Sequence, residues 1–204
     1  MSENKIFGLN EHEICRLLCY TFGFLALALV LVYGSKAIFE GIGPVGESFV
    51  NEELPAPNFN VLGFPIYAKP ITWFSFFSFL YWAFGLETWR KRFLNMKPIY
   101  RRLLFPVVSL VAFGSAYEIF FNFGLWTALM SITGMLGVLN PDVLVNIFNV
   151  PRAINLVFAT KICFLVFGLS MYSLFFLLRV DKEALRERDE VIEALPSRAR
   201  VSNK

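Results

Sequence analysis

Histidine is scarce in this chain of 204 residues, and its scarcity excludes several kinds of site. His12 is the single histidine, and it lies outside the long apolar runs. One histidine cannot supply both axial ligands of a haem, and it disfavours a metal centre built from several histidines. It also leaves no histidine for a serine–histidine pair inside a membrane. We therefore expect neither a metal nor another cofactor.

Cysteine is nearly as scarce, and the three cysteines have no metal-binding or redox spacing. Cys15 and Cys19 are separated by three residues, whereas redox and zinc motifs separate their cysteines by two. On a helix these two thiols would be neighbours, but cysteine also packs as a small apolar residue. Cys163 stands alone in the last apolar run. We favour a packing role for Cys15 and Cys19.

Motifs that mark common enzymes are missing as well. The sequence has no Walker A pattern, no GxSxG and no paired acidic motif for magnesium. The chain is therefore expected not to be an enzyme. An enzyme that acts on a lipid or quinone stays as a third alternative, without a motif to support it.

Charge is the fourth scarcity, and it indicates a membrane protein. Charged residues make up 17% of the chain, against about a quarter in a soluble domain. Hydrophobic residues make up 56%, include 24 phenylalanines and occur in long runs. Because backbone amides inside a bilayer must bond internally, such runs must be helical. We expect an all-α integral membrane protein whose main partner is the lipid bilayer. The mild net charge of +3 does not indicate a nucleic-acid partner.

Four segments approach the roughly 20 apolar residues that a membrane span needs. The sequence predicts a four-transmembrane-helix bundle with spans at about 15–38, 71–89, 103–124 and 153–178. These spans form one domain, 1–180, and residues 181–204 are expected to form a cytoplasmic helical tail. The outer loop, 39–70, is rich in proline and glutamate, so a regular helix is not expected there.

The third apolar run is too long for one ordinary span. Residues 103–139 form 37 consecutive, mainly apolar positions. As one helix they would extend about 55 Å, against a hydrocarbon core of about 30 Å. We therefore expect a break between Asn122 and Thr127, beside Gly124. An extra interfacial or re-entrant helix is expected to follow over residues 125–136.

The positions of lysine and arginine predict the orientation. Thirteen of them lie between spans two and three or in the C-terminal tail, and three lie in the other two loops. The positive-inside rule then places both termini in the cytoplasm of a multi-pass cell-membrane protein. An even number of spans is consistent with that placement.

Glu118 is a carboxylate inside the third apolar run, where a charge costs about 2.5–3.5 kcal/mol. Lys161 lies at a similar depth in the fourth run, which is antiparallel to the third. The sequence therefore predicts that these two residues face each other as an ion pair.

A polar cluster is expected around that pair. Ser115 and Asn122 follow helical spacing from Glu118, and Tyr172 follows it from Lys161. Such stripes favour close packing with hydrogen bonds between helices. A structural role and a functional role for the cluster are both left open.

Glu87 is a further acidic residue, near the inner interface. It precedes Arg90 and Lys91 by three and four residues, so a local ion pair on one helix is expected.

The leading prediction for function is a non-catalytic membrane component, either a homo-oligomer or a small subunit of a larger membrane complex. The missing catalytic motifs and the polar packing stripes support it. The alternative is a small transporter or channel that uses the Glu118–Lys161 pair.

Overall fold

A computed structural model describes residues 10–39, 59–61, 64–66, 69–136 and 153–201. Its helices are α1 (Glu11–Phe39), α3 (Pro70–Thr88), α4 (Arg90–Leu94), α5 (Pro98–Leu136) and α7 (Ala153–Val201). Strands β1 (Phe59–Val61) and β2 (Phe64–Ile66) pair antiparallel, with Phe59 opposite Ile66. The described part of the 39–70 connection thus contains a short hairpin and no helix.

In the described part of the chain, three helices are long and apolar enough to cross a membrane. The stretches are His12–Ser35 in α1, Pro98–Ile132 in α5 and Phe158–Glu190 in α7. These stretches fit the helical membrane class that the composition predicts. The helix α3 is not among the three, because its Trp, Tyr and Ser residues lower its hydropathy. Its 19 residues still extend about 28 Å, close to the thickness of the hydrocarbon core.

The starts of the helices have local causes. Both α3 and α5 begin at a proline, Pro70 and Pro98. Proline suits the first helical position because its fixed φ is already helical and its missing N–H is not needed there. The turn between α3 and α4 at Trp89 then redirects the chain toward α5.

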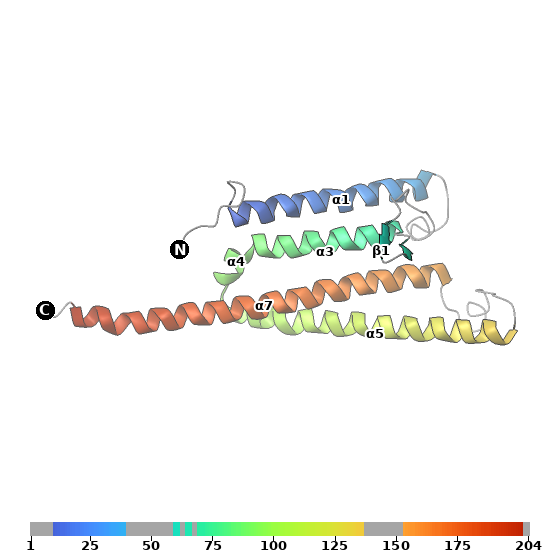
Figure 1. Ribbon diagram of the computed structural model, residues 1–204. Coiled ribbons are helices and arrows are strands. Elements are labelled where there is room, and N and C mark those ends of the chain that lie inside the picture. The colour runs from blue at the N-terminus through green and yellow to red at the C-terminus, as the bar shows by residue number, and fades with distance from the viewer. Residues whose placement is uncertain (1–9, 40–58, 62–63, 67–68, 137–152, 202–204) are drawn as a thin grey trace.

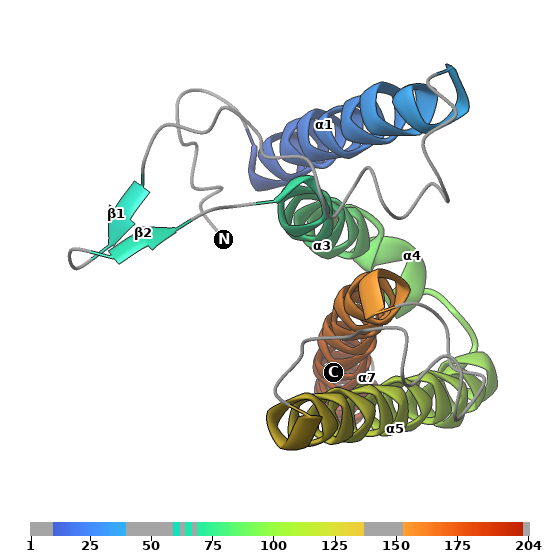
Figure 2. The ribbon, with the colours of Figure 1, turned by 90° about the vertical axis from the view of Figure 1, so that its right-hand side faces the viewer.

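The four long helices alternate in direction and lie in an open row (Figure 1). Viewed along the helices, their order is α1, α3, α7 and α5 (Figure 2). The extensive contacts run between α1 and α3, between α3 and α7, and between α7 and α5. The row is not closed around a central core, so α1 and α5 are its two edges. The short helix α4 marks one end of the row, here called the α4 end, where α1 and α5 begin and α3 ends.

Buried apolar residues of the described helices form two small clusters. Tyr33 and Ile71 are the buried centre of the cluster toward the end opposite α4. Leu86, Phe176 and Val180 are the buried centre of the other, at the α4 end. Most large apolar side chains on α1 and α5 are exposed instead. This is the distribution expected where lipid, not water, surrounds the helices.

The predicted break in the third apolar run is wrong. The helix α5 is continuous from Pro98 to Leu136, through Gly124. A glycine costs about 1 kcal/mol in a helix interior, which is too little to end a helix of 39 residues. Residues 125–136 are therefore the last turns of α5 and not a separate interfacial or re-entrant helix. At about 58 Å, α5 exceeds the hydrocarbon core and extends past the neighbouring helices (Figure 1).

The helix α7 is also longer than its apolar part. It continues as one helix to Val201, so the predicted boundary at residue 180 is not a break in the backbone. Its charged C-terminal half extends beyond the α4 end of the row (Figure 1).

Candidate functional site

The two charges inside the apolar runs are not brought together. Lys161 Nζ donates a hydrogen bond to Thr72 Oγ1 on α3, at 3.2 Å. Glu118 is exposed on α5, and it forms no ion pair with any residue that the structure describes. It is close enough to Cys163 of α7 for an electrostatic interaction. The expected ion pair is absent because α7 lies between α3 and α5, and Lys161 contacts α3.

The other members of the predicted polar cluster separate into two groups. Ser115 and Asn122 are buried on the face of α5 that packs on α7. Ser115 donates its hydroxyl within its own helix, to Val111 O at 2.8 Å and Ala112 O at 3.0 Å. Tyr172 is half-buried on α7 and donates its hydroxyl to Glu87 of α3, at 3.2 Å. No single site contains all five residues, and any functional role for them remains a prediction.

Carboxylates at the α4 end pair across helices, which the sequence analysis did not predict. Glu87 of α3 binds Arg179 of α7, not Arg90 or Lys91 in its own segment. Arg90 instead pairs with Glu183 of α7 at 2.7 Å. The sequence contains one indication of these ion pairs. Acidic residues follow the apolar part of α7, and their charge is opposite to that of the arginines in the 90–102 segment.

Arg101 completes this set of cross-helix contacts. Its side chain is 95% buried, and Nη2 lies 3.7 Å from Asp181 Oδ1 of α7. Its Nε and Nη1 have no hydrogen-bond partner within the described structure. The contacts of Glu87, Arg90 and Arg101 together attach α3, α4 and α5 to α7 at this end.

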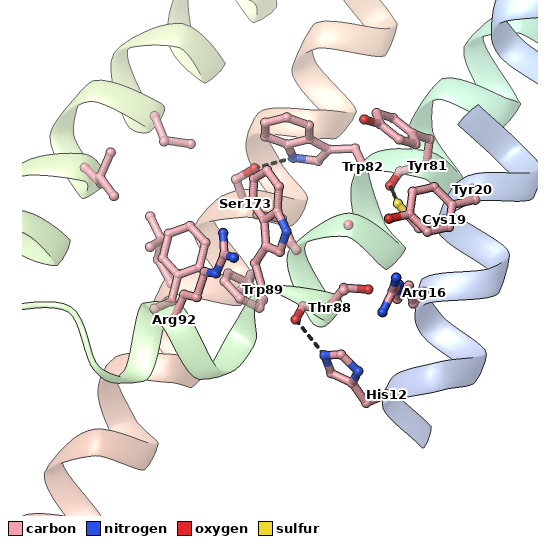
Figure 3. A pocket seen from close by; sticks show the side chains of 17 residues that line it. His12, Arg16, Cys19, Tyr20, Tyr81, Trp82, Thr88, Trp89, Arg92 and Ser173 are labelled. Carbon is pink, nitrogen blue, oxygen red and sulfur yellow. Dashed lines mark hydrogen bonds between the residues drawn. The ribbon is translucent and has the colours of Figure 1, made fainter. Parts of the chain in front are cut away.

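A cavity of about 650 Å³ opens beside these contacts at the α4 end. It extends from α1 across α3 and α4 to α5 and α7, so every helix contributes to its wall (Figure 3). Leu104, Val108 and Leu177 belong to its apolar part, and Tyr81, Trp82 and Trp89 to its aromatic part. None of the described residues that line it is an Asp or Glu.

Basic side chains line the same cavity. Arg16 comes from α1 and Arg92 from α4, and His12 stands one helical turn before Arg16 (Figure 3). His12 Nε2 lies 3.2 Å from the Thr88 carbonyl oxygen, so that nitrogen donates and attaches α1 to the end of α3. The guanidinium of Arg16 lies 5.8 Å from the centre of the Tyr20 ring. Neither Arg16 nor Arg92 has a carboxylate partner among the described residues.

A second, smaller groove lies between α3 and α7. Its volume is about 360 Å³, and Lys161, Thr72 and Ser75 are its polar lining. Aromatic residues Phe76, Phe79 and Phe164 form most of the remaining lining. The groove therefore contains one cation and two hydroxyls within apolar walls.

Within the described ranges, no three His, Cys, Asp or Glu side chains are grouped so that they could hold a metal ion. The cavity at the α4 end therefore offers cations, aromatic rings and apolar surface as its chemistry. Comparison of the chain with protein-family models, with curated proteins and with solved structures gives no match.

Proposed function

We propose that the chain is a non-catalytic integral membrane component that assembles through α5, with a second copy of itself or with other membrane subunits. The observation that carries this proposal is the exposed carboxylate of Glu118 on an edge helix. The helix α5 packs on α7 along one side, and Glu118 lies at the margin of that contact, because the buried residues Ser115 and Asn122 stand three and four residues from it.

The surroundings of Glu118 make this exposure costly in lipid. Phe121, three residues after Glu118 on the same side of α5, is 51% exposed, and Phe113 and Phe120, on the opposite side of the helix, are 77% and 76% exposed. A charge among such residues, within an apolar span, costs about 2.5–3.5 kcal/mol and usually has a partner. Because the described chain supplies no ion pair, a donor on another chain would reduce that cost.

The proposal includes the orientation of the chain. Four spans with the α4 end in the cytoplasm would place the arginines of α4 and α5, and the charged half of α7, on the inner side of the cell membrane. The thirteen-to-three distribution of Lys and Arg supports this orientation. The start of α1 and the end of α7 lie toward the same end of the row, which is consistent with it (Figure 1).

Photo-crosslinking in native membranes tests the assembly. A photoreactive phenylalanine at Phe121 should form a protein adduct whose mass identifies a second copy or another subunit. The same group at Phe175, exposed on α7, is the matched control and should yield fewer protein adducts. Glu118→Gln should reduce the adduct at position 121. Lipid adducts alone at position 121 would overturn the proposal.

A transporter or channel is the second candidate. The groove that contains Lys161, Thr72 and Ser75 favours it, because a half-buried cation beside hydroxyls could contact a passing anion. An ion-flux assay in vesicles tests it. Lys161→Met should abolish any flux that this groove carries, and unchanged flux would exclude the groove as the pathway.

A further inference from the structure

The cavity at the α4 end combines a basic and an apolar lining. One part of its lining is basic, with Arg16, Arg92 and His12, and the rest is aromatic or aliphatic. Its volume of about 650 Å³ lies within the range of about 300–1,000 Å³ that is usual for small-molecule sites. An amphiphile with an anionic head and an apolar body has the matching chemistry.

The two arginines of the cavity differ from three other arginines at this end. Arg90, Arg101 and Arg179 all contact carboxylates, namely Glu183, Asp181 and Glu87. Arg16 and Arg92, which both line the cavity, contact no carboxylate among the described residues. The cations that lack an acidic partner are therefore the ones available to an anion.

The arrangement of the lining orients such a ligand. His12 and Arg16 lie in the first turns of α1, and Arg92 lies on α4, so the basic groups are near the end of the row. The cavity residues Trp82, Val108 and Ser173 lie deeper in the row, farther from the α4 end. Trp82 Nε1 already donates to Ser173 Oγ, at 2.8 Å, so this deeper wall offers rings and methyl groups instead of free donors.

We propose that this cavity binds an acidic phospholipid. Its anionic headgroup lies at the basic part of the lining, with Arg16 and Arg92, and an acyl chain lies against Trp82, Leu104 and Val108. Arginine suits the phosphate because its planar guanidinium donates two parallel hydrogen bonds. This proposal does not depend on how the chain assembles, since the cavity is built from one copy.

Tryptophan fluorescence can test the proposal, because Trp82 and Trp89 line the cavity. The full chain is reconstituted in phosphatidylcholine vesicles that contain increasing fractions of phosphatidylglycerol with brominated acyl chains. Bromine quenches nearby tryptophan, so binding gives saturable quenching at low phosphatidylglycerol fractions. Brominated phosphatidylcholine is the neutral comparison, and it should quench only in proportion to its abundance.

Charge variants test the headgroup contact. Arg16→Gln and Arg92→Gln should each weaken the preference for phosphatidylglycerol about fivefold, the effect expected for one basic residue at an anionic surface. The matched control is the double change Lys97→Gln and Arg102→Gln. It removes as much charge as the Arg16→Gln and Arg92→Gln changes combined, from the same end of the row but from residues outside the cavity lining. An equal loss in the control, or no loss in the Arg16 and Arg92 variants, would overturn the proposal.

A shape variant tests the chain contact without changing charge. Val108→Phe fills part of the cavity and should reduce the quenching, whereas Val107→Phe adds the same ring to an exposed position outside the lining. Equal effects of the two changes would contradict an acyl chain in this cavity.

Competition with soluble glycerol phosphate distinguishes a phospholipid headgroup from a free phosphate ester as the occupant. Displacement of the lipid by millimolar glycerol phosphate would identify an anion site and would overturn the lipid site.

Discussion

Trp82 on α3 donates the hydrogen of its indole nitrogen to the hydroxyl of Ser173 on α7, at 2.8 Å. Ser173 in turn donates to the Leu169 carbonyl oxygen of its own helix, at 2.7 Å. The hydroxyl therefore uses both its acceptor and its donor capacity, and it links the two central helices of the row. Hydrogen bonds between membrane helices contribute about 0.6 kcal/mol on average and up to about 1.7 kcal/mol.

A double-mutant cycle should detect this link. Trp82→Phe and Ser173→Ala should show a coupling free energy of about 0.6–1.7 kcal/mol in SDS denaturation of the purified protein. Ser170→Ala is the control, because Ser170 donates only to Val166 of its own helix in the described structure. Coupling of Trp82→Phe to Ser170→Ala as strong as to Ser173→Ala would contradict the assignment.

Glu118 and Lys161 should behave as independent residues. Glu118→Gln should change the stability of the isolated chain little, because its side chain is exposed and forms no ion pair with the described residues. Lys161→Met should remove the bond to Thr72. In the double variant, the two changes in unfolding free energy should add within about 0.5 kcal/mol. A larger coupling, measured in the same SDS denaturation, would show that the two charges do contact each other.

The Glu87–Arg179 pair should stabilise the α4 end. The Glu87 side chain is only 21% exposed and also accepts a hydrogen bond from Tyr172. Glu87→Gln should therefore lower the unfolding free energy by about 1–2 kcal/mol, less than for a fully buried pair because Arg179 is half-exposed. Glu190→Gln is the control, since its pair with Arg186 is largely exposed. Thermal unfolding in detergent should show a clear loss for the first change and little for the second.

Replacement of Gly23 and of Gly124 by alanine should change the stability of the protein in opposite directions. At Gly23 of α1, an added Cβ would lie 2.8 Å from Cδ2 of Tyr81 on α3, so the ring must move. Gly23→Ala should cost about 1–3 kcal/mol, as overpacking does, and Tyr81→Leu should relieve part of that cost. At Gly124 of α5, nothing lies within 4 Å of the added atom. Gly124→Ala should stabilise the continuous helix by about 0.5–1 kcal/mol. Destabilisation by Gly124→Ala in thermal unfolding would instead indicate a hinge there.

The orientation can be tested by cysteine labelling. In a background that lacks Cys15, Cys19 and Cys163, a cysteine at position 50 should react with an impermeant reagent only from outside the cell. A cysteine at position 200 should react only after the membrane is opened. The reverse pattern would refute cytoplasmic termini.

The sequence alone was sufficient for the class of this protein and for the approximate positions of its helices. Long apolar runs with few charges permit only helices in a bilayer, so α1, α5 and α7 follow from composition. The starts of α3 at Pro70 and of α5 at Pro98 can also be recognised from the sequence, because proline favours the first position of a helix. The end of the helix in the run over residues 103–136 was harder to predict, because a glycine weakens a helix without determining whether the helix ends there. The helix α5 continues through Gly124 because the cost of one glycine is too small to end a long helix, and the apolar pattern alone does not show that balance.

The order of the helices, and hence the partner of each charged residue, was decided only by the tertiary structure. Depth along a span can be counted from the sequence, and it placed Glu118 and Lys161 at one level. It gives no information about rotation or neighbours, and Lys161 contacts Thr72 because α7 packs between α3 and α5. Glu87 likewise binds Arg179, which lies 92 residues away, and not the nearby Arg90. The cavity has the same origin, because Arg16 and Arg92 line one space only after four helices pack into an open row.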